Sequence, residues 1–227
     1  MNIENTNVYG FEDAIRGMRN PLNSWGNSDS YYIKSVDGSE YILGEKDKDL
    51  CHRLLSTPSD SDSKFLRMIY VNTDIVAPVY WVQEIDTYKI STVRDSCSLQ
   101  HRGMTRDYAL DDFTLDANIH VPIFERDDES YDTFDFVIQK YIDEVINPLR
   151  KKYKETGDYR YFRAMRQALP MGYNYRFTWS ANYAVLRNIY RQRKNHRLSE
   201  WHEFCEWIES LPYAEDLITY GIKEKMC

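Results

Sequence analysis

The sequence contains no long hydrophobic run among its 227 residues. The longest stretch without charged or strongly polar side chains, residues 75–82, is short and contains a proline, whereas a transmembrane helix needs about 20 consecutive apolar residues. Residues 1–13 are polar and acidic, and they lack the basic and apolar regions of a secretory signal. We therefore expect a cytoplasmic protein that has no membrane partner.

Cysteine is scarce, and the four cysteines Cys51, Cys97, Cys205 and Cys227 form no C-x-x-C or C-x-H spacing. A structural zinc site needs four clustered ligands, but the five histidines do not gather near any pair of cysteines. We therefore expect reduced, free thiols and no bound metal. The sequence also lacks the glycine-rich phosphate loops, the G-x-S-x-G elbow and the H-E-x-x-H helix, so the mechanisms that use them lose their usual support.

Acidic residues outnumber basic ones, 36 to 29, but the two signs are unevenly distributed. Residues 150–197 hold 13 basic and only two acidic side chains, a net charge of +11, so the remainder of the chain carries −18. The acidic remainder argues against wrapping a long nucleic acid, whereas the basic segment suits a small phosphorylated ligand. Arginines on solvated helix faces would give the same count, and both interpretations stay open.

The residue pattern predicts a mixture of strands and helices without an internal repeat. Helices are expected at residues 11–20, 45–56, 79–88, 130–156, 158–169, 180–194 and 199–210, strands at residues 68–76 and 173–179, and a hairpin at residues 31–43. Ser180 and Ser199 are the expected N-caps of their helices, Pro78 is expected in the first turn of another, and Pro148 should kink or end the long helix. No proline- or glycine-rich linker divides the chain, which favours one α+β or α/β domain.

The predicted helix at residues 180–194 is the most informative segment. Asn182 and Arg193 are eleven residues apart, which returns to the same helix face after three turns, and Leu186 and Ile189 lie between them. Arg193 would also complement the helix dipole from the last turn. The functional interpretation is a nucleotide or cofactor pocket in which Arg193 binds a carbonyl or phosphate, with Arg166 as a second cation.

Residues 86–98, DTYKISTVRDSCS, combine hydroxyl groups with charges of both signs. Small hydroxyl residues and their backbone N–H groups can cradle a phosphate, and Asp95 can accept hydrogen bonds from a sugar or neutralise an arginine. Cys97 is a candidate thiolate nucleophile beside cations such as Lys89 and Arg94, although most free cysteines are buried and inert. The simplest interpretation of His196, after the arginine-rich helix, is a capping or solvent-facing role.

Residues 166–193, RQALPMGYNYRFTWSANYAVLRNIYRQR, resemble the C-terminal region of the flavin-dependent thymidylate synthases. That family shows an arginine before Leu-Pro, then an aromatic residue and Trp-[Thr/Ser]-x-Asn, a second asparagine six residues later and an arginine five beyond it. Thr178 stands where the family usually has the aromatic residue. The residues that match this pattern are Arg166, Trp179, Ser180, Asn182, Asn188 and Arg193, and Trp201 and His196 lie near a tryptophan and a histidine of the family.

A weaker match lies upstream, where the family has a strand, Ala-Pro and a helix that carries R-H-R-x-x-S-x-N-x-x-S-x-R. Ala77 and Pro78 follow a predicted strand and precede a predicted helix in the same way. At the signature positions the chain departs from the family: Thr87, Tyr88 and Lys89 replace Arg-His-Arg, Thr92 and Cys97 replace serines, and Leu99 replaces the last arginine. The resemblance covers residues 66–210 and is strongest in its last third.

The resemblance implies a single α+β domain over residues 1–227, of the thymidylate synthase-complementing type, with a central, mostly antiparallel sheet flanked by helices. It implies a homotetrameric enzyme that converts dUMP to dTMP with FAD, NADPH and methylenetetrahydrofolate. The residue roles carried over by the resemblance are catalysis for Arg193 and Lys89, dUMP binding for Arg166, Arg193, Asp95, Ser96, Cys97 and Ser98, and flavin binding for Asn182, Asn188, Tyr88, Lys89 and His196.

Two alternatives keep a pyrimidine nucleotide as the ligand but change the activity. In the first, Cys97 attacks C6 of the pyrimidine covalently, as a thiol does in uracil methylation without flavin. In the second, the basic segment binds a nucleotide for regulation or assembly and catalyses no reaction.

Overall fold

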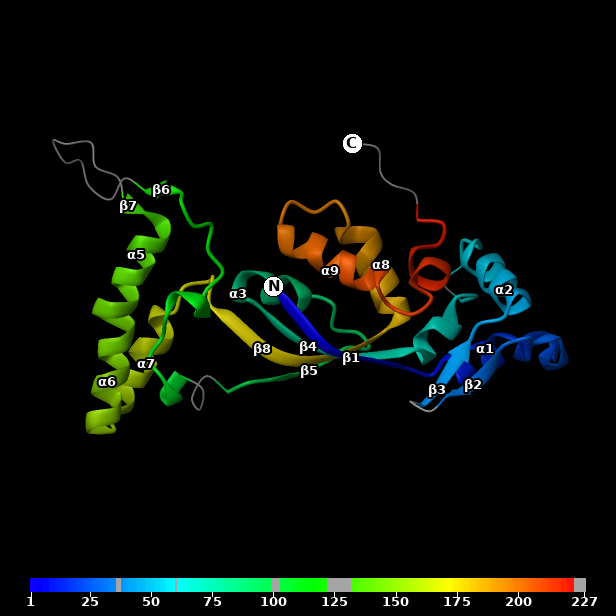
Figure 1. Cartoon of the computed structure of the whole chain (residues 1–227), viewed down its shortest axis with the longest axis horizontal. Coiled ribbons are helices and arrows are strands. Elements are labelled where there is room, and N and C mark those ends of the chain that lie inside the picture. The colour runs from blue at the N-terminus through cyan, green and yellow to red at the C-terminus, as the bar shows by residue number, and fades with distance from the viewer. Residues whose placement is uncertain (36–37, 60, 99–102, 122–131, 223–227) are drawn as a thin grey trace. The chain divides into compact units, whose positions relative to one another are not determined.

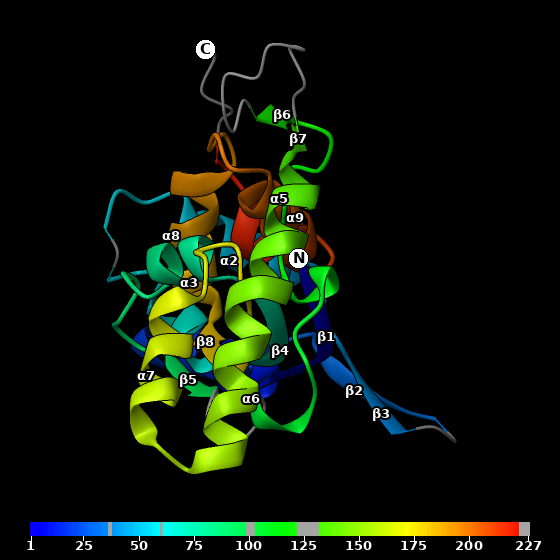
Figure 2. The ribbon, with the colours of Figure 1, turned by 90° about the vertical axis from the view of Figure 1, so that its left-hand side faces the viewer.

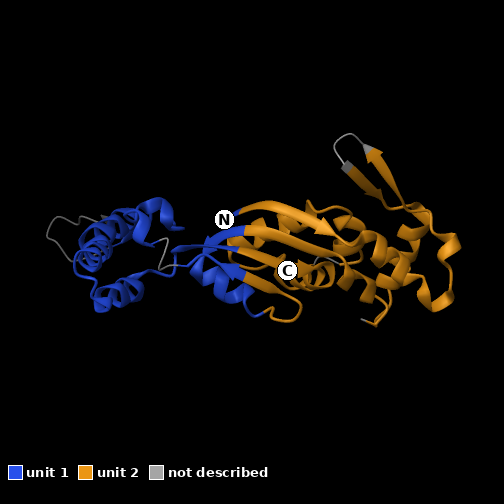
Figure 3. Ribbon diagram, turned by 90° about the horizontal axis from the view of Figure 1, so that it is seen from below, with its two compact units in different colours: residues 1–2, 75–87, 95–177 blue, residues 3–74, 88–94, 178–227 orange. Residues whose placement is uncertain are grey.

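The structure is a computed structural model that describes residues 1–35, 38–59, 61–98, 103–121 and 132–222. Contacts within the chain divide it into two compact units, shown in blue and orange in Figure 3. Unit 1 contains residues 1–2, 75–87 and 95–177, and unit 2 contains residues 3–74, 88–94 and 178–227. The interpretation of the whole chain as one domain stays a prediction.

Four strands form the main sheet, in the order β1-β4-β8-β5. Their bounds are Asn2–Tyr9 (β1), Tyr70–Pro78 (β4), Asn174–Asn182 (β8) and Val93–Ser96 (β5). Buried and less buried residues alternate along β4, from Val71 to Ala77, because one face of the sheet is covered and the other is not. The antiparallel sheet and the helices that flank it confirm the predicted α+β class (Figure 1).

The helices and the hairpin of unit 2 come from the N-terminal and the C-terminal parts of the chain. They are α1 (Phe11–Met18), η1 (Asn20–Leu22), η2 (Trp25–Asn27), the hairpin β2 (Tyr31–Ser35) and β3 (Gly38–Ile42), α2 (Glu45–Leu55), η3 (Lys64–Met68), α8 (Tyr183–Arg193), α9 (Ser199–Glu209) and the π-helical turn η6 (Glu215–Thr219). Helix α9 packs on the sheet through Phe204, whose ring centroid lies 5.8 Å from that of Trp179 in β8. The Trp207 indole N–H also donates to the Thr6 hydroxyl of β1 at 3.1 Å.

Unit 1 consists mainly of helices. Its elements are α3 (Val79–Ile85), η4 (Leu110–Asp112), β6 (His120–Val121), β7 (Asp132–Thr133), α5 (Phe134–Tyr141), the π-helical turn η5 (Ile142–Ile146), α6 (Asn147–Thr156) and α7 (Tyr159–Ala168). Helices α6 and α7 lie side by side (Figure 2), and Phe162 and Met165 of α7 share a buried core with Ile142 and Ile146. The sequence predicted that Pro148 kinks or ends the long helix. The π-helical turn ends two residues before Pro148, and it is an irregularity of this kind, because the proline ring crowds the carbonyl four residues earlier.

Several expected boundaries are wrong by a few residues. Ser180 does not cap a helix: strand β8 continues through it because Phe177, Trp179 and Ala181 alternate into the buried face, and Asn182 is the N-cap. Leu198 precedes α9, so Ser199 is its first helical residue, and Pro78 likewise precedes α3 instead of lying in its first turn.

Strands β1 and β5 were not predicted, because both are largely exposed and lack the apolar alternation of a half-buried strand. The predicted hairpin at residues 31–43 is confirmed in its two strands, and its turn at residues 36–37 lies outside the described residues.

Within the described residues, no helix is both long and apolar enough to cross a membrane, and no cluster of three His, Cys, Asp or Glu residues is arranged for a metal ion. Cys51, Cys97 and Cys205 are free thiols, and Cys227 lies outside the described part of the chain. Burial raises the pKa of Cys51 and of Cys205 to about 12, so neither thiol ionises near neutral pH.

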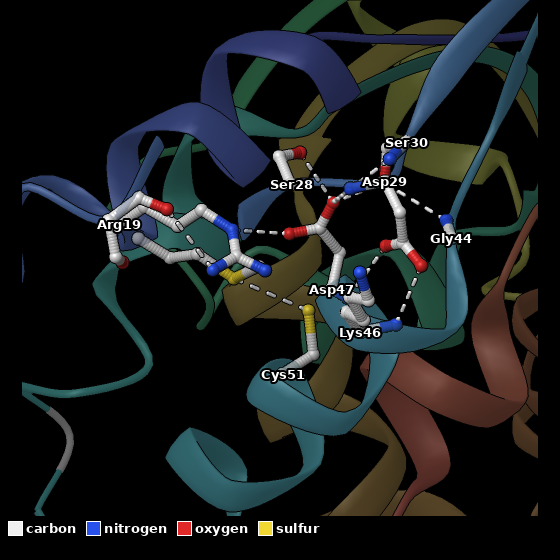
Figure 4. A network of polar contacts seen from close by, with 10 residues as sticks. Arg19, Ser28, Asp29, Ser30, Gly44, Lys46, Asp47 and Cys51 are labelled. Atoms are coloured by element: carbon white, nitrogen blue, oxygen red, sulfur yellow. Dashed lines mark hydrogen bonds and ion pairs between the residues drawn. The ribbon is translucent and has the colours of Figure 1, made fainter. Parts of the chain in front are cut away.

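A buried carboxylate organises the first part of unit 2 (Figure 4). Asp47 is fully buried, and its Oδ1 accepts a hydrogen bond from Arg19 Nε at 2.6 Å. Its Oδ2 accepts from the hydroxyls of Ser28 and Ser30 at 2.6 and 2.7 Å and from the backbone N–H groups of Asp29 and Ser30 at 3.2 and 3.1 Å. Burial alone would raise the pKa of Asp47, but the hydrogen bonds from Ser28, Ser30 and Arg19 together hold this pKa below its ordinary value.

The carboxylate of Asp29 caps helix α2, since it accepts the N–H groups of Lys46 and Asp47 at 3.0 and 3.2 Å. A Cβ atom at Gly44 would lie 2.2 Å from this carboxylate, so only glycine permits the close approach. The loop that contains Ser28, Asp29 and Ser30 is therefore fixed to α2 by two carboxylates.

We predict that Asp47→Asn lowers the free energy of unfolding by about 3 kcal/mol at pH 7, because it leaves the buried Arg19 guanidinium without a counter-ion. The folded-state pKa of Asp47 is depressed, so its stabilisation is present above the ordinary carboxylate pKa and is lost as the pH falls through the folded value. Urea unfolding at several pH values should therefore show the deficit narrowing below about pH 4. The control Glu45→Gln, in an exposed ion pair with Lys48, should change stability by less than about 1 kcal/mol. An equal loss in both variants would contradict the account.

Candidate functional site

Helix α8 begins where strand β8 ends, and Asn182 forms the junction. Its backbone is extended (φ −125°, ψ 167°), and its Oδ1 accepts a hydrogen bond from the Val185 N–H at 3.0 Å. This N-cap satisfies one of the backbone donors that the first turn leaves unbonded. The side chain is buried, and its oxygen orients the helix, so the flavin contact that the resemblance gave to Asn182 stays a prediction.

Five side chains gather where α8 ends, and we call them the Arg193 cluster: Tyr88, Gln192, Arg193, His196 and Trp201. The Arg193 Nε–H donates to the Tyr88 hydroxyl at 3.0 Å, and this hydroxyl donates to Gln192 Oε1 at 2.9 Å. The Arg193 guanidinium lies 4.7 Å from the ring centroid of Trp201 and 5.8 Å from that of Tyr88. Trp201 is fully buried and Arg193 is half-buried, so the cation lies against a rigid aromatic wall.

His196 belongs to the same cluster through its ring, which meets Trp201 edge-on at a centroid distance of 6.2 Å. Its Nδ1 accepts a hydrogen bond from the Leu198 N–H at 3.3 Å, and its carbonyl is bonded to His202 Nε2 at 2.6 Å. These contacts lie just before α9, whose N-cap is Leu198, so the capping or solvent-facing role expected for His196 stays a prediction.

The Arg193 cluster holds a planar cation in a defined orientation. Because its Nε–H is bonded to Tyr88 and its face lies on Trp201, the guanidinium loses little conformational freedom when it binds a ligand. A guanidinium held in this way can donate two parallel hydrogen bonds to a carbonyl edge or a phosphate. The cluster therefore has the chemistry of a site for a polar planar ring or an oxyanion.

A second site in unit 2, which we call the basic hollow, lies between η3 and α8. Its lining residues are Ser63, Leu66, Arg67, Ala184, Arg187, Asn188 and Arg191, around about 540 Å³ of empty space that includes a part open to solvent. The four lining residues from α8 follow the pattern i, i+3, i+4 and i+7, which puts them on one face of the helix. The part of this space comparable with known ligand cavities is about 160 Å³, below the roughly 300–1,000 Å³ of whole small-molecule sites, so the hollow accommodates a part of a ligand. Three guanidinium groups suit a part that carries more than one negative charge.

Several donors in the basic hollow are available to a ligand. The Oδ1 of Asn188 accepts hydrogen bonds from Gln192 and Arg191 at 2.9 and 3.1 Å, while its amide N–H groups have no partner in the described residues. Arg67 is exposed and has no ion pair within the described chain. Burial lowers the pKa of Arg187, and the neighbouring positive charge of Arg191 lowers it further. Both effects disfavour the charged guanidinium, so an anion bound in the hollow would stabilise it.

The other predicted substrate residues belong to unit 1, whereas the Arg193 cluster and the basic hollow are formed by residues of unit 2. Arg166 is exposed on α7 and has no ion pair with a described residue. Asp95 and Ser96 end strand β5, and Cys97 and Ser98 follow it with exposed side chains. The backbone N–H of Cys97 donates to the Arg176 carbonyl at 2.9 Å, so this amide is used by the sheet and does not cradle a phosphate.

The structure thus brings together Tyr88, Arg193 and His196, all of which the sequence had singled out. Asn188 lies in the basic hollow, whereas Lys89 is exposed and has no hydrogen bond or ion pair with a described residue. The sequence analysis missed Arg67, Arg187 and Arg191 as members of a site. The spacing of Arg187, Asn188 and Arg191 on one helix face was a usable signal for two of them, but nothing in the sequence pairs Arg67 with α8.

No protein-family model matches the sequence, and no curated protein matches it. Among solved structures, the chain is similar to the flavin-dependent thymidylate synthase ThyX from Helicobacter pylori complexed with FAD and dUMP. One such structure has a TM-score of 0.66 and 18% identity and covers 99% of this chain and 100% of that one. A second has a TM-score of 0.68 and 17% identity over the same shares.

The chain is also similar to the UMP/dUMP methylase PolB from Streptomyces cacaoi bound with 5-Br dUMP. This match has a TM-score of 0.58 and 13% identity and covers 97% of this chain and 96% of that one. The chain therefore has the α+β fold of these nucleotide enzymes over its whole length. The resemblance to flavin-dependent thymidylate synthases, predicted from residues 166–193, is confirmed at the level of the fold.

We predict that Tyr88→Phe lowers the free energy of unfolding by about 1 kcal/mol, because the hydroxyl that links Arg193 to Gln192 is lost in a half-buried position. Urea unfolding followed by tryptophan fluorescence measures the change. Tyr70→Phe is the matched control, since Tyr70 is exposed and its hydroxyl makes no hydrogen bond to the part of the chain that the structure describes. If both variants have the stability of the original protein, the Tyr88 hydroxyl does not hold Arg193.

Proposed function

We propose that the chain is a flavin-dependent methylase of pyrimidine nucleotides that converts dUMP to dTMP with FAD, NADPH and methylenetetrahydrofolate. The observation that carries the proposal is the arrangement of α8, which has a basic hollow on one face and an oriented guanidinium at its end. The fold shared with ThyX, whose structure holds FAD and dUMP, supports the same assignment. From the sequence resemblance of residues 166–193 we also propose a homotetramer.

We propose that the basic hollow binds the diphosphate of FAD, a group that needs several cationic donors. Arg67, Arg187 and Arg191 supply the charge, and the unbonded amide N–H groups of Asn188 supply neutral donors beside it. When bound, the flavin would provide the reducing equivalents for the methylation. Asn182 affects this site indirectly, because its N-cap hydrogen bond fixes the direction of α8. Lys89, which replaces a flavin-binding arginine of the family, is exposed and adds a mobile cation.

The Arg193 cluster fits the pyrimidine ring of dUMP. We propose that Arg193 donates to a ring carbonyl, while Trp201 and Tyr88 keep its guanidinium in the plane that this contact needs. A fixed cation at this place stabilises negative charge that develops on the pyrimidine during the reaction. Arg166, which has no ion pair in the described chain, is the proposed ligand of the nucleotide phosphate, together with the hydroxyl groups of Ser96 and Ser98. Asp95 would accept a hydrogen bond from the sugar of the nucleotide.

The likeness to PolB favours a second candidate, the methylation of UMP as well as dUMP. Both nucleotides present the same ring carbonyls and phosphate, so the two proposed arginines do not distinguish them. An assay with both substrates decides between them. Cys97 enters this comparison as the proposed nucleophile of a reaction without flavin; it is exposed, as a reacting thiol must be.

We predict that the purified protein is yellow, or becomes yellow when FAD is added and the excess removed, and that dUMP stimulates its oxidation of NADPH. Visible absorption and the NADPH absorbance measure these two properties. Protein that stays colourless after incubation with FAD would contradict the proposal. Under the flavin mechanism Cys97→Ala keeps its activity, and a complete loss in this variant would favour covalent attack by the thiol.

We predict that Arg193→Ala weakens dUMP binding by at least about tenfold, since a hydrogen bond to a charged donor contributes roughly 1.5–3 kcal/mol. Isothermal titration calorimetry measures the dissociation constant, and circular dichroism verifies that the variant is folded. Arg197→Ala is the matched control, because Arg197 is exposed, lies four residues away and has no partner in the described chain. An unchanged dissociation constant in Arg193→Ala would show that the nucleotide binds elsewhere.

A further inference from the structure

Residues 215–222, which we call the strap, run along helices α8 and α2 of unit 2. The strap begins with the π-helical turn η6, and its side chains Leu217 and Ile218 are fully buried. It packs against both helices. Neither the resemblance to known enzymes nor the fold assigns a function to this segment.

The strap meets the basic hollow at Arg187. The Nη1 of Arg187 donates to the carbonyls of Ile218 and Tyr220 at 2.6 and 2.8 Å. Its Nη2 and Nε groups have no partner among the described residues, and Arg187 lines the hollow. One end of the guanidinium is therefore bound to the strap, and the remaining donors are available to a ligand.

The strap is itself fixed to α2 by His52. The rings of His52 and Tyr220 stack with centroids 3.7 Å apart and an angle of 6° between their planes. The Nε2 of His52 is bonded to Asp216 Oδ1 at 2.9 Å, and Lys48 Nζ lies 3.9 Å from the other oxygen of the same carboxylate. These contacts hold the strap at Asp216, before the two carbonyls that bind Arg187, and at Tyr220, which supplies one of them.

We propose that the strap is a positioning element of the basic hollow, which fixes the Arg187 guanidinium so that its free donors bind the diphosphate of a dinucleotide cofactor. An arginine held in this way has already lost its rotamer freedom, so less affinity is lost when the ligand binds. The inference rests on the proposed function, because it takes the hollow as the site of the cofactor. It adds that Tyr220 and His52, which do not line the hollow, determine its affinity.

The test compares Tyr220→Ala with Tyr220→Phe, which keeps the stacked ring and removes a hydroxyl that makes no hydrogen bond with a described residue. Inorganic pyrophosphate and FAD are the probes, titrated by calorimetry at fixed ionic strength, and dUMP is titrated as a third ligand. Tyr220→Ala should weaken pyrophosphate and FAD binding by about five- to tenfold, in line with the freedom that one arginine side chain regains. Tyr220→Phe should stay within about twofold of the original protein, and dUMP binding should be unchanged in both variants.

A double variant separates positioning from a general loss of structure. If the strap acts through Arg187, then Tyr220→Ala should cause no further loss of affinity in the Arg187→Ala background. Should Tyr220→Ala fail to fold, Asp216→Asn weakens the bond to His52 with a smaller change of volume and takes its place. Cofactor affinity that is unchanged in the folded variant, or a loss that adds to that of Arg187→Ala, overturns the inference and leaves the proposed function standing. An original protein that binds neither pyrophosphate nor FAD overturns both.

Discussion

The constraint on which the site depends is the hydrogen bond between the Asn182 side chain and the Val185 N–H, where β8 becomes α8. A helix advances about 100° per residue, so the residue at which it starts decides which side chains face each neighbour. With Asn182 as the cap, Arg187, Asn188 and Arg191 face η3 and form the basic hollow. A start two residues earlier, at Ser180, would turn these side chains by roughly half a revolution.

The basic hollow is electrostatically unfavourable without a ligand, because like charges face one another in a partly buried space. In the structure, uncharged oxygen atoms accept hydrogen bonds from these arginines and so offset part of the repulsion between them. The carbonyls of Ile218 and Tyr220 accept from Arg187, and the Asn188 side-chain oxygen accepts from Arg191. Neutral acceptors orient these cations, and no described carboxylate forms an ion pair with them. An anion then binds with a gain that a neutral ligand cannot match, which is the property that a diphosphate site requires.

Much of the fold followed from local patterns, since the helices at α1, α2, α7, α8 and α9 and the β2–β3 hairpin have clear periodicity or turn chemistry. The sheet was harder to predict because β1 is polar and exposed, and its strand conformation depends on pairing with β4, which is distant in sequence. Within the site, the sequence singled out Tyr88, Arg193 and His196, which do meet. Arg67 could not be found, since an exposed arginine after a serine-rich loop gives no signal until η3 is packed against α8.

The central claim is that one helix serves two ligands, a flavin on its face and a nucleotide at its end. A crystal structure of the protein soaked with FAD and dUMP tests this claim most directly. The account predicts diphosphate density within hydrogen-bonding distance of Arg187 and Arg191, and pyrimidine density whose carbonyl edge contacts the Arg193 guanidinium. Flavin bound away from the hollow, with Arg187 and Arg191 facing only solvent, would contradict the account.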